Sequence, residues 1–208
     1  MVGPYTALTS EAITQAKRSN KRSCSTSGRG YTMIEVVVML AIVTAISTVV
    51  LISFTGLNEG GAVNRSAREL ALAIRRAQNM SLAVTQVPTS SGPRIPPAVG
   101  LKLDRSNPTA YFTFADLVLD NKYVSADDAQ IGVDETFPRG TRINLLTGPT
   151  GSPHTIVYIM FAAPEAVVTL SDINGASIGD KVEIEIVSAS GLYKKRITVR
   201  TSGQVGIK

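Results

Sequence analysis

The residue whose chemistry stands out is Glu35, a carboxylate at the start of a long apolar segment. Residues from Val36 to Phe54 carry no charge and consist mostly of Val, Ile, Leu, Met and Ala. At about 1.5 Å of rise per residue, a helix of this length is just long enough to cross ~30 Å of hydrocarbon. An ionisable group beside a membrane span is costly, so Glu35 is a functional candidate that needs a partner. The alternative is a signal anchor in which Glu35 only lies at the membrane interface.

The sequence before this segment is basic and ends at Gly30. Five cations precede the glycine: Lys17, Arg18, Lys21, Arg22 and Arg29. The motif Gly30-Tyr31-Thr32-Met33-Ile34-Glu35 resembles the class III signal of type IV pilins and type II secretion pseudopilins, in which the glycine is usually followed by Phe-Thr-Leu-Ile-Glu. Tyr for Phe and Met for Leu are conservative departures. The competing interpretation, a cleavable secretory signal, predicts a shorter apolar stretch that ends in a small-residue cut site.

The resemblance implies how the segment is used. In this family a prepilin peptidase, which is also the N-methyltransferase, cuts after the glycine on the cytoplasmic side and methylates the new N-terminal residue, here Tyr31. The apolar helix then anchors the protein in the inner membrane and later forms the filament core. There the carboxylate of Glu35 would meet the N-terminus of a neighbouring subunit, an ion pair strengthened by low dielectric. The implied partners are the peptidase, other pilins or pseudopilins, and an inner-membrane assembly platform.

The distribution of charge predicts the orientation in the membrane. The 208-residue chain has a formal net charge of +5, but residues 1–30 contain five Lys/Arg against one acid, for +4. The remainder has 16 basic and 15 acidic residues, for +1. Because Lys/Arg hold their flank of the first span in the cytoplasm, we expect a cytoplasmic N-terminus and a periplasmic domain. The only cysteine, Cys24, lies in the leader, so the processed chain would form no disulfide.

After the apolar segment, residues 58–87 have the period of an amphipathic helix. Three glycines in residues 56–61 each weaken a helix by about 1 kcal/mol, so this stretch is either a linker or an easily unwound helix segment. Beyond it, apolar and small residues recur at threes and fours: Val63, Ala67, Leu70, Ile74, Ala77, Ser81 and Val84. This face is expected to pack on a sheet. The neighbouring arginines at 65, 68, 75 and 76 are interpreted as a solvated flank in preference to a phosphate site. Pro88 and residues 91–93 are expected to end the helix.

From residue 95 onward the period changes to two. This pattern predicts strands at 98–103, 109–115, 141–146, 155–162, 181–187, 195–200 and 204–207. A hairpin is expected at residues 191–194, with two cross-strand pairings: Glu183 and Glu185 with Lys195 and Arg200. One helix followed by a run of strands predicts an α+β fold, and the resemblance implies the pilin fold, a long N-terminal helix packed on an antiparallel sheet.

Four regions follow from these boundaries. Residues 1–30 are the expected cleaved basic leader, and residues 31–57 the transmembrane and filament-core helix. Residues 58–87 are the amphipathic half of the helix, and residues 88–208 the β-sheet domain.

The resemblance extends to the GspH/FimT group of this family. Residues 70–84 look like its Ala-Arg-rich helix, residues 111–123 like its mid-domain strand and acidic loop, and residues 196–207 like its closing hairpin. The group's usual Phe-x-Pro-x-Gly is replaced by residues 161–166, Phe-Ala-Ala-Pro-Glu-Ala, so this loop is expected to differ. The group implies a minor pseudopilin of a type II secretion pseudopilus, which exports proteins across the outer membrane.

The alternative within the group is a FimT-like minor type IV pilin that serves pilus assembly and DNA uptake. DNA would be bound by the basic C-terminal hairpin, where the candidates are Lys194, Lys195, Arg196 and Arg200, with Lys208 and Tyr193 nearby. Phosphate contacts of this kind release counterions, so the affinity would fall with salt.

Enzyme chemistry has little support in the sequence. His154 is the single histidine, and a processed chain without cysteine has neither a Cys/His nucleophile nor a His-rich metal site. Four acids are spaced like an oxygen-ligand cation loop, although they fit no EF-hand: Asp116, Asp120, Asp127 and Asp128. Calcium is therefore an alternative to a simple solvated turn. Phosphate-loop, nucleophile-elbow and zinc-helix motifs are absent from the sequence. We expect a non-enzyme with no catalytic residue, metal or cofactor.

Overall fold

The computed structural model describes residues 30–89 and 92–208, without the side chains of residues 52–57. Of the expected leader only Gly30 is described, so Cys24 and the basic residues before it lie outside this part of the chain. Two compact units are present, with the boundary between Ser47 and Thr48.

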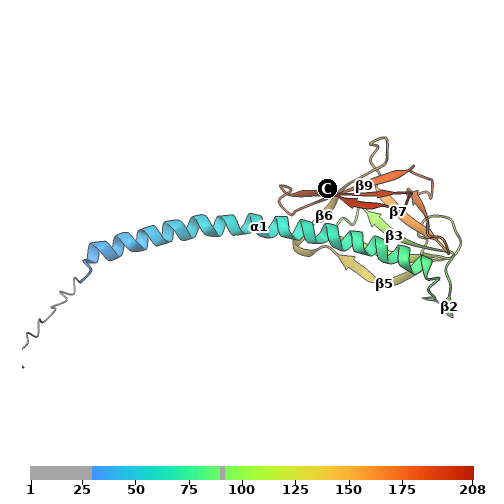
Figure 1. Ribbon diagram of the computed structural model, residues 1–208, viewed down its shortest axis with the longest axis horizontal. Coiled ribbons are helices and arrows are strands. Elements are labelled where there is room, and N and C mark those ends of the chain that lie inside the picture. The colour runs from blue at the N-terminus through green and yellow to red at the C-terminus, as the bar shows by residue number, and fades with distance from the viewer. Residues whose placement is uncertain (1–29, 90–91) are drawn as a thin grey trace, which may run out of the picture. The chain divides into compact units, whose positions relative to one another are not determined.

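The elements follow one another as one long helix and then a series of strands (Figure 1). Their bounds are α1 (Met33–Leu82), β1 (Val87–Thr89), β2 (Gly92–Arg94), β3 (Ala98–Asp104), β4 (Ala110–Asp116), β5 (Ala129–Thr136), η1 (Pro138–Gly140), β6 (Arg142–Thr147), β7 (Ile156–Ala162), β8 (Val167–Ser171), β9 (Lys181–Val187), β10 (Lys194–Arg200) and β11 (Val205–Ile207). The chain is therefore a mixed α+β protein with one N-terminal helix that begins as an apolar segment, as expected from the change of period along the sequence.

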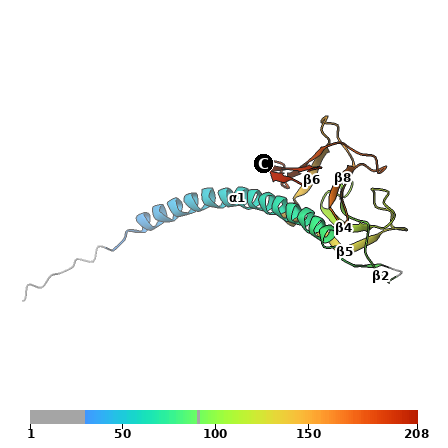
Figure 2. The same ribbon diagram turned by 45° about the vertical axis from the view of Figure 1, so that its right-hand side comes forward.

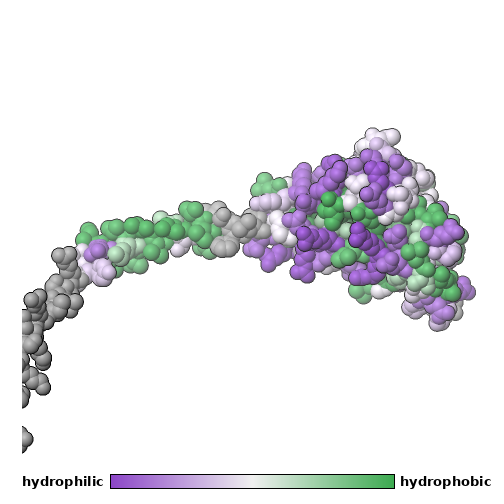
Figure 3. Space-filling view, in the orientation of Figure 1, coloured by the Kyte–Doolittle hydropathy of each residue, from purple (hydrophilic) through white to green (hydrophobic). Residues whose placement is uncertain are grey.

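The first part of α1 is apolar and uncovered. Residues Met33–Leu51 form a segment of mean hydropathy 2.6 that is long and apolar enough to cross a membrane, and none of it is buried. Its apolar side chains form a nearly continuous hydrophobic surface in Figure 3. By length and composition this segment is a membrane-span candidate, a test that an N-terminal signal sequence also satisfies. The predicted span ended at Phe54, whose side chain lies outside the described residues.

Helix α1 continues through the glycine-rich stretch, so of the two alternatives there the helix segment is present and the linker is not. Gly60 and Gly61 both lie within the helix. The helix ends at Leu82, before the prolines that were expected to stop it. Its end is a Schellman motif, in which the N–H of Val84 donates to Ser81 O at 3.1 Å and the N–H of Thr85 donates to Met80 O at 3.1 Å. Val84 has a φ of 49°, the left-handed conformation that this motif requires.

Two antiparallel sheets make up the β domain. The first has five strands in the order β5-β4-β3-β7-β8, and the second has four in the order β11-β10-β9-β6. The prolines at 88 and 93 pair with each other in a separate short hairpin formed by β1 and β2. All seven predicted strands are confirmed to within one residue at each end. The hairpin predicted at residues 191–194 is also confirmed, since β9 and β10 pair directly.

Four strands, β1, β2, β5 and β8, were not predicted, and β1 and β2 have only three residues each. Strand β5 is an edge strand with the burial of a mostly solvated segment, and it contains Gly132 and several polar residues, so it lacks an apolar alternation. Strand β8 has only five residues, of which Val168, Leu170 and Ser171 are buried. Short edge strands carry too few apolar positions for the period of two to be recognised.

The core lies between the second half of α1 and the inner faces of both sheets (Figures 1 and 2). Helix residues Val63, Leu70 and Ile74 are fully buried, which confirms the predicted apolar face except at Val84, which follows the helix and is exposed. They belong to one cluster with Leu101 of the first sheet and Ile184 of the second. The helix therefore holds the two sheets together through a single apolar stripe.

Candidate functional site

The motif around Glu35 forms the first turn of α1. Gly30 and Tyr31 precede the helix and are exposed, with the Tyr31 side chain 71% accessible. Thr32 caps the helix, because its Oγ1 accepts a hydrogen bond from the N–H of Glu35 at 3.3 Å. Glu35 is thus the acidic residue of the first turn, where a negative charge is favoured by the helix dipole.

The carboxylate of Glu35 is available to another molecule. The residue is exposed, and within residues 30–89 and 92–208 its side chain forms no hydrogen bond or ion pair. Its neighbours on the helix are exposed apolar side chains, among them Met33 and Ile34. A carboxylate in such surroundings offers one strong acceptor for a cation that the described part of this chain does not supply.

The basic hairpin is largely neutralised by acids of the adjacent strand. Arg196 bonds to Glu183 at 3.2 Å and to Glu185 at 3.5 Å, and Lys194 lies 3.5 Å from Glu185. Glu185 also accepts a hydrogen bond of 2.7 Å from the amide of Asn144. This amide, followed by the charges of Lys194 and Arg196, lowers the pKa of the Glu185 carboxyl.

The predicted partners of Glu183 and Glu185 were wrong. The register of β9 and β10 places Arg196 directly opposite Glu185, whereas Lys195 lies opposite Ile186 and therefore on the other face. Arg200 lies opposite Lys181. Among the described residues neither Lys195 nor Arg200 forms an ion pair, so these two of the four candidate DNA-binding cations keep their charge uncompensated.

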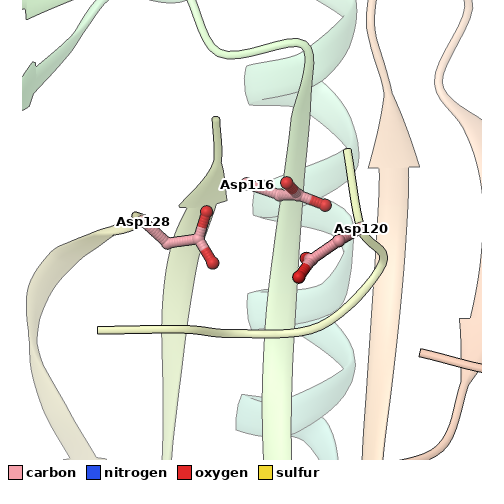
Figure 4. Close-up of side chains that lie close together, drawn as sticks. All are labelled: Asp116, Asp120 and Asp128. Atoms are coloured by element: carbon pink, nitrogen blue, oxygen red, sulfur yellow. The ribbon is translucent and has the colours of Figure 1, made fainter. Parts of the chain in front are cut away.

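Three of the four candidate calcium ligands come together beside β4 (Figure 4). One carboxylate oxygen from each of Asp116, Asp120 and Asp128 lies within 4.8 Å of the other two. Asp127 is not part of this group. Burial raises the pKa of Asp128, and the charge of Asp116 adds to this effect.

The backbone already uses the oxygens of this acidic cluster. Asp116 accepts from the N–H groups of Leu119 at 2.6 Å, Val118 at 3.1 Å and Asn121 at 3.1 Å. Asp128 accepts from Leu117 at 3.0 Å and Val124 at 2.8 Å. The carboxylates of Asp116 and Asp128 therefore hold the loop between β4 and β5 by accepting its backbone hydrogen bonds. This role accounts for the position of both side chains without a bound ion.

His154 lies apart from all of these groups. It is partly exposed in the connection between β6 and β7, and its backbone N–H donates to Leu146 O at 2.8 Å. Its ring packs near Gly148. The single histidine is therefore part of the packing of a loop.

The helix arginines fall into two kinds. Arg65 bonds to Glu69 at 2.8 Å and Arg76 to Glu135 at 3.3 Å, as expected of a solvated flank. Arg68 and Arg75 instead line a groove of about 410 Å³ between α1 and β11, together with Ala71, Leu72, Val205 and Ile207. Periodicity alone did not reveal this groove, because β11 reaches the helix only through the tertiary fold.

Comparisons of this chain with protein-family models, with curated proteins and with solved structures find no match.

Proposed function

We propose that this chain is a minor pilin-like subunit, processed after Gly30, methylated at Tyr31 and assembled through Glu35 into a membrane-anchored filament. The observation that carries the proposal is the position of Glu35, an exposed carboxylate in the first turn of an uncovered apolar helix. The finer assignment is a minor pseudopilin of a type II secretion pseudopilus for protein export. Catalysis is not part of this role.

The N-terminal motif supplies both partners of an intermolecular ion pair. Cutting after Gly30 creates an amine at Tyr31, four residues before Glu35 in the same apolar surroundings. In a bundle of such helices, the amine of one subunit can meet the Glu35 carboxylate of the next. Low dielectric strengthens that attraction, and the cost of leaving either charge unpaired makes the contact selective for register.

The uncovered apolar surface of α1 supports the same proposal. Val43, Ile46 and Val49 are each more than half exposed, as are many of their neighbours. A surface of this size in water is an interaction site or a membrane contact. Lipid can cover it before assembly, and helices of other subunits can cover it in a filament.

Cross-linking in the native membrane tests the proposal and separates its versions. A photo-reactive residue at Val43, in the apolar helix, is expected to capture pilin-type subunits that mass spectrometry can identify. Secretion-system pseudopilins among them would support the pseudopilus, and pilus subunits would support the FimT-like alternative. The same group at Val133, which is 80% exposed on β5, is the matched control. Capture at Val43 of no pilin-type subunit in cells that assemble the filament would contradict the proposal.

The FimT-like alternative also predicts DNA binding, for which the hairpin now offers fewer free cations. Of the four candidates, only Lys195 and Arg200 lack an ion pair within the described residues. If DNA binds there, affinity should fall linearly with the logarithm of the salt concentration. Replacing Lys195 and Arg200 by Gln should reduce that slope, whereas replacing the paired Lys194 should change it less.

A further inference from the structure

The connection between β9 and β10 contacts α1 near Glu59 and Gly60. Ser190 Oγ donates a hydrogen bond to the carboxylate of Glu59. The ring of Tyr193 lies so close to Gly60 that a Cβ there would be 3.3 Å from it. The first buried residues of the helix in this domain, Ala62 and Val63, follow immediately. The connection therefore covers α1 at Glu59 and Gly60, shortly after the apolar segment.

This connection exposes an apolar residue at its tip. Leu192 is 81% accessible, more than any other large apolar side chain described in residues 58–208. Tyr193 beside it is 39% accessible, so its ring is shared between the helix and solvent. An exposed leucine next to a half-exposed tyrosine is the combination that membrane-water interfaces favour.

Cations surround the same end of the domain. Arg142 donates to the carbonyl of Ala189 at 3.3 Å, which fixes it beside the connection. Arg139, in the turn η1, lines a cavity of about 240 Å³ with Arg65 of the helix. Lys194 begins β10 directly after Tyr193.

The nearby acids are already engaged. Glu59 accepts from Ser190, Glu69 pairs with Arg65, and Glu185 is held by Asn144 and by the cations of β10. These pairs use the charges of Arg65 and Lys194, whereas Glu59 accepts from a neutral hydroxyl and keeps its charge. Among the described residues Arg139 and Arg142 form no ion pair, so two unpaired cations stand against the one carboxylate of Glu59, and this excess of positive charge attracts the phosphates of anionic lipids.

The number of residues between the apolar segment and Glu59 determines how far this surface lies from the hydrocarbon of the membrane. The uncharged segment ends at Phe54, and Glu59 follows five residues later, about 7.5 Å along a helix. The polar headgroup layer on one side of a bilayer is roughly 5–7 Å thick. If the apolar segment fills the hydrocarbon, Glu59 lies at the outer edge of the headgroup layer, and the connection that binds it reaches the acyl chains only through its tip.

We propose that, in the membrane-inserted subunit, the connection between β9 and β10 docks on the bilayer surface beside its own helix. Leu192 inserts into the upper acyl region, Tyr193 lies among the headgroups, and Arg139 and Arg142 contact lipid phosphates. This inference rests on the proposed membrane anchoring and adds a second, reversible membrane contact. The contact would have to be released before the subunit enters a filament.

Tryptophan fluorescence can test this contact without interference, because the chain contains no tryptophan. Leu192→Trp is made in the full chain and reconstituted into vesicles of phosphatidylethanolamine and phosphatidylglycerol. The expected result is blue-shifted emission that is quenched by lipids brominated near the top of the acyl chain. Val133→Trp, at an equally exposed position on β5, should emit at longer wavelength and remain unquenched. Val49→Trp reports insertion of the helix itself.

The three reporters separate the docking from the anchoring. Quenching at Val49→Trp with none at Leu192→Trp would overturn the docking while leaving the anchor intact. Quenching at neither position would overturn both. A blue shift at Leu192→Trp that appears only when other pilin-type subunits are added would assign the tip to a protein contact and overturn the lipid contact. Loss of the blue shift when phosphatidylglycerol is replaced by phosphatidylcholine would support the role of the cations.

Discussion

Glu35 is the residue on which assembly is expected to depend. Glu35→Ala should leave membrane insertion intact, because the apolar segment is unchanged, but it should block incorporation into a filament. Removing one partner of a buried ion pair costs about 3–5 kcal/mol, which is enough to exclude the variant from the assembly. The measurement is the amount of the variant in purified filaments relative to membranes. Glu165→Ala, at an exposed acid of the β domain, is the control, and normal incorporation of Glu35→Ala would rule out the role.

Gly30 is expected to determine processing. Gly30→Leu should abolish cleavage, because a side chain is placed at the residue that the peptidase must accept before the cut. Immunoblotting of membranes should show only the full-length chain. Gly28→Leu, two residues upstream, should still be processed, and a mature-sized band from Gly30→Leu would show that the cut lies elsewhere.

Glu185 should give the β domain part of its resistance to acid. Its pKa is lowered in the folded state by Asn144 first and then by the charges of Lys194 and Arg196. The stabilisation is therefore complete above the unfolded-state value of 4.5 and is lost as the pH falls through the lower folded-state pKa.

Glu185→Gln should lower the free energy of unfolding at neutral pH by a few tenths to about 1 kcal/mol, because the interactions are solvent-screened. The difference from wild type should vanish in acid, as measured by urea unfolding across pH. Glu165→Gln should show no such convergence. An equal deficit for Glu185→Gln at all pH values would contradict the charge-based explanation.

At the scale of elements, the sequence predicted most strands but not all of their relationships. A period of two identified β9 and β10 because alternate residues such as Ile184 and Val199 are buried. The predicted pairing of the two glutamates with Lys195 overlooked this alternation, which places Lys195 on the same side as Ile197 and leaves Arg196 opposite Glu185. Strand β5 was missed because its stability comes from backbone pairing at a sheet edge and not from burial of its own side chains.

The end of α1 could not be predicted from the sequence, because it depends on tertiary packing. Proline is a recognised stop signal, yet the helix ends at Leu82 in a motif that uses Val84 in a left-handed conformation. A β-branched residue is disfavoured there, so the tertiary packing must supply the compensation. Buried Ser81, whose Oγ donates to Phe161 O at 2.9 Å, is one contact that fixes this turn on the sheet.

The glycine-rich part of α1 should respond to substitutions that favour a helix. Gly61 is exposed and a Cβ there would meet nothing within 4 Å, so Gly61→Ala should stabilise the helix by about 0.5–1 kcal/mol. At Gly60 the same gain should be reduced, since a Cβ would press on the Tyr193 ring at 3.3 Å. Amide hydrogen exchange across residues 56–62 provides the measurement. Faster exchange in Gly61→Ala would show that this stretch is not helical in solution.

At the scale of the whole molecule, apolar residues form two sets, one buried in the core and one exposed. One set is buried between α1 and the two sheets, as in any folded domain. The other, in Met33–Leu51, has no cover within the described residues. The sequence distinguished these sets by charge and period, because the first lies in segments interrupted by polar residues and the second does not. The β domain and the second half of α1 thus bury their own apolar residues. The apolar segment needs a membrane or other helices to cover it.

The candidate site was predictable only where its chemistry is local. Gly30, Tyr31 and Glu35 are adjacent in the sequence, and the structure adds the cap from Thr32 and the exposure of the carboxylate. The tip at Leu192 and the groove beside Leu72 were not predicted, because each depends on strands that approach α1 from far along the chain. Long-range surfaces of this kind leave no periodic signal.

The most direct test of the central proposal is the intact mass of the protein isolated from its native membrane. We predict a chain that begins at Tyr31 and carries one added methyl group on the new N-terminus. That result would establish both the cut after Gly30 and the retention of the apolar helix with Glu35. A chain that still contains residues 1–30, or one cut within or after the apolar segment, would contradict it.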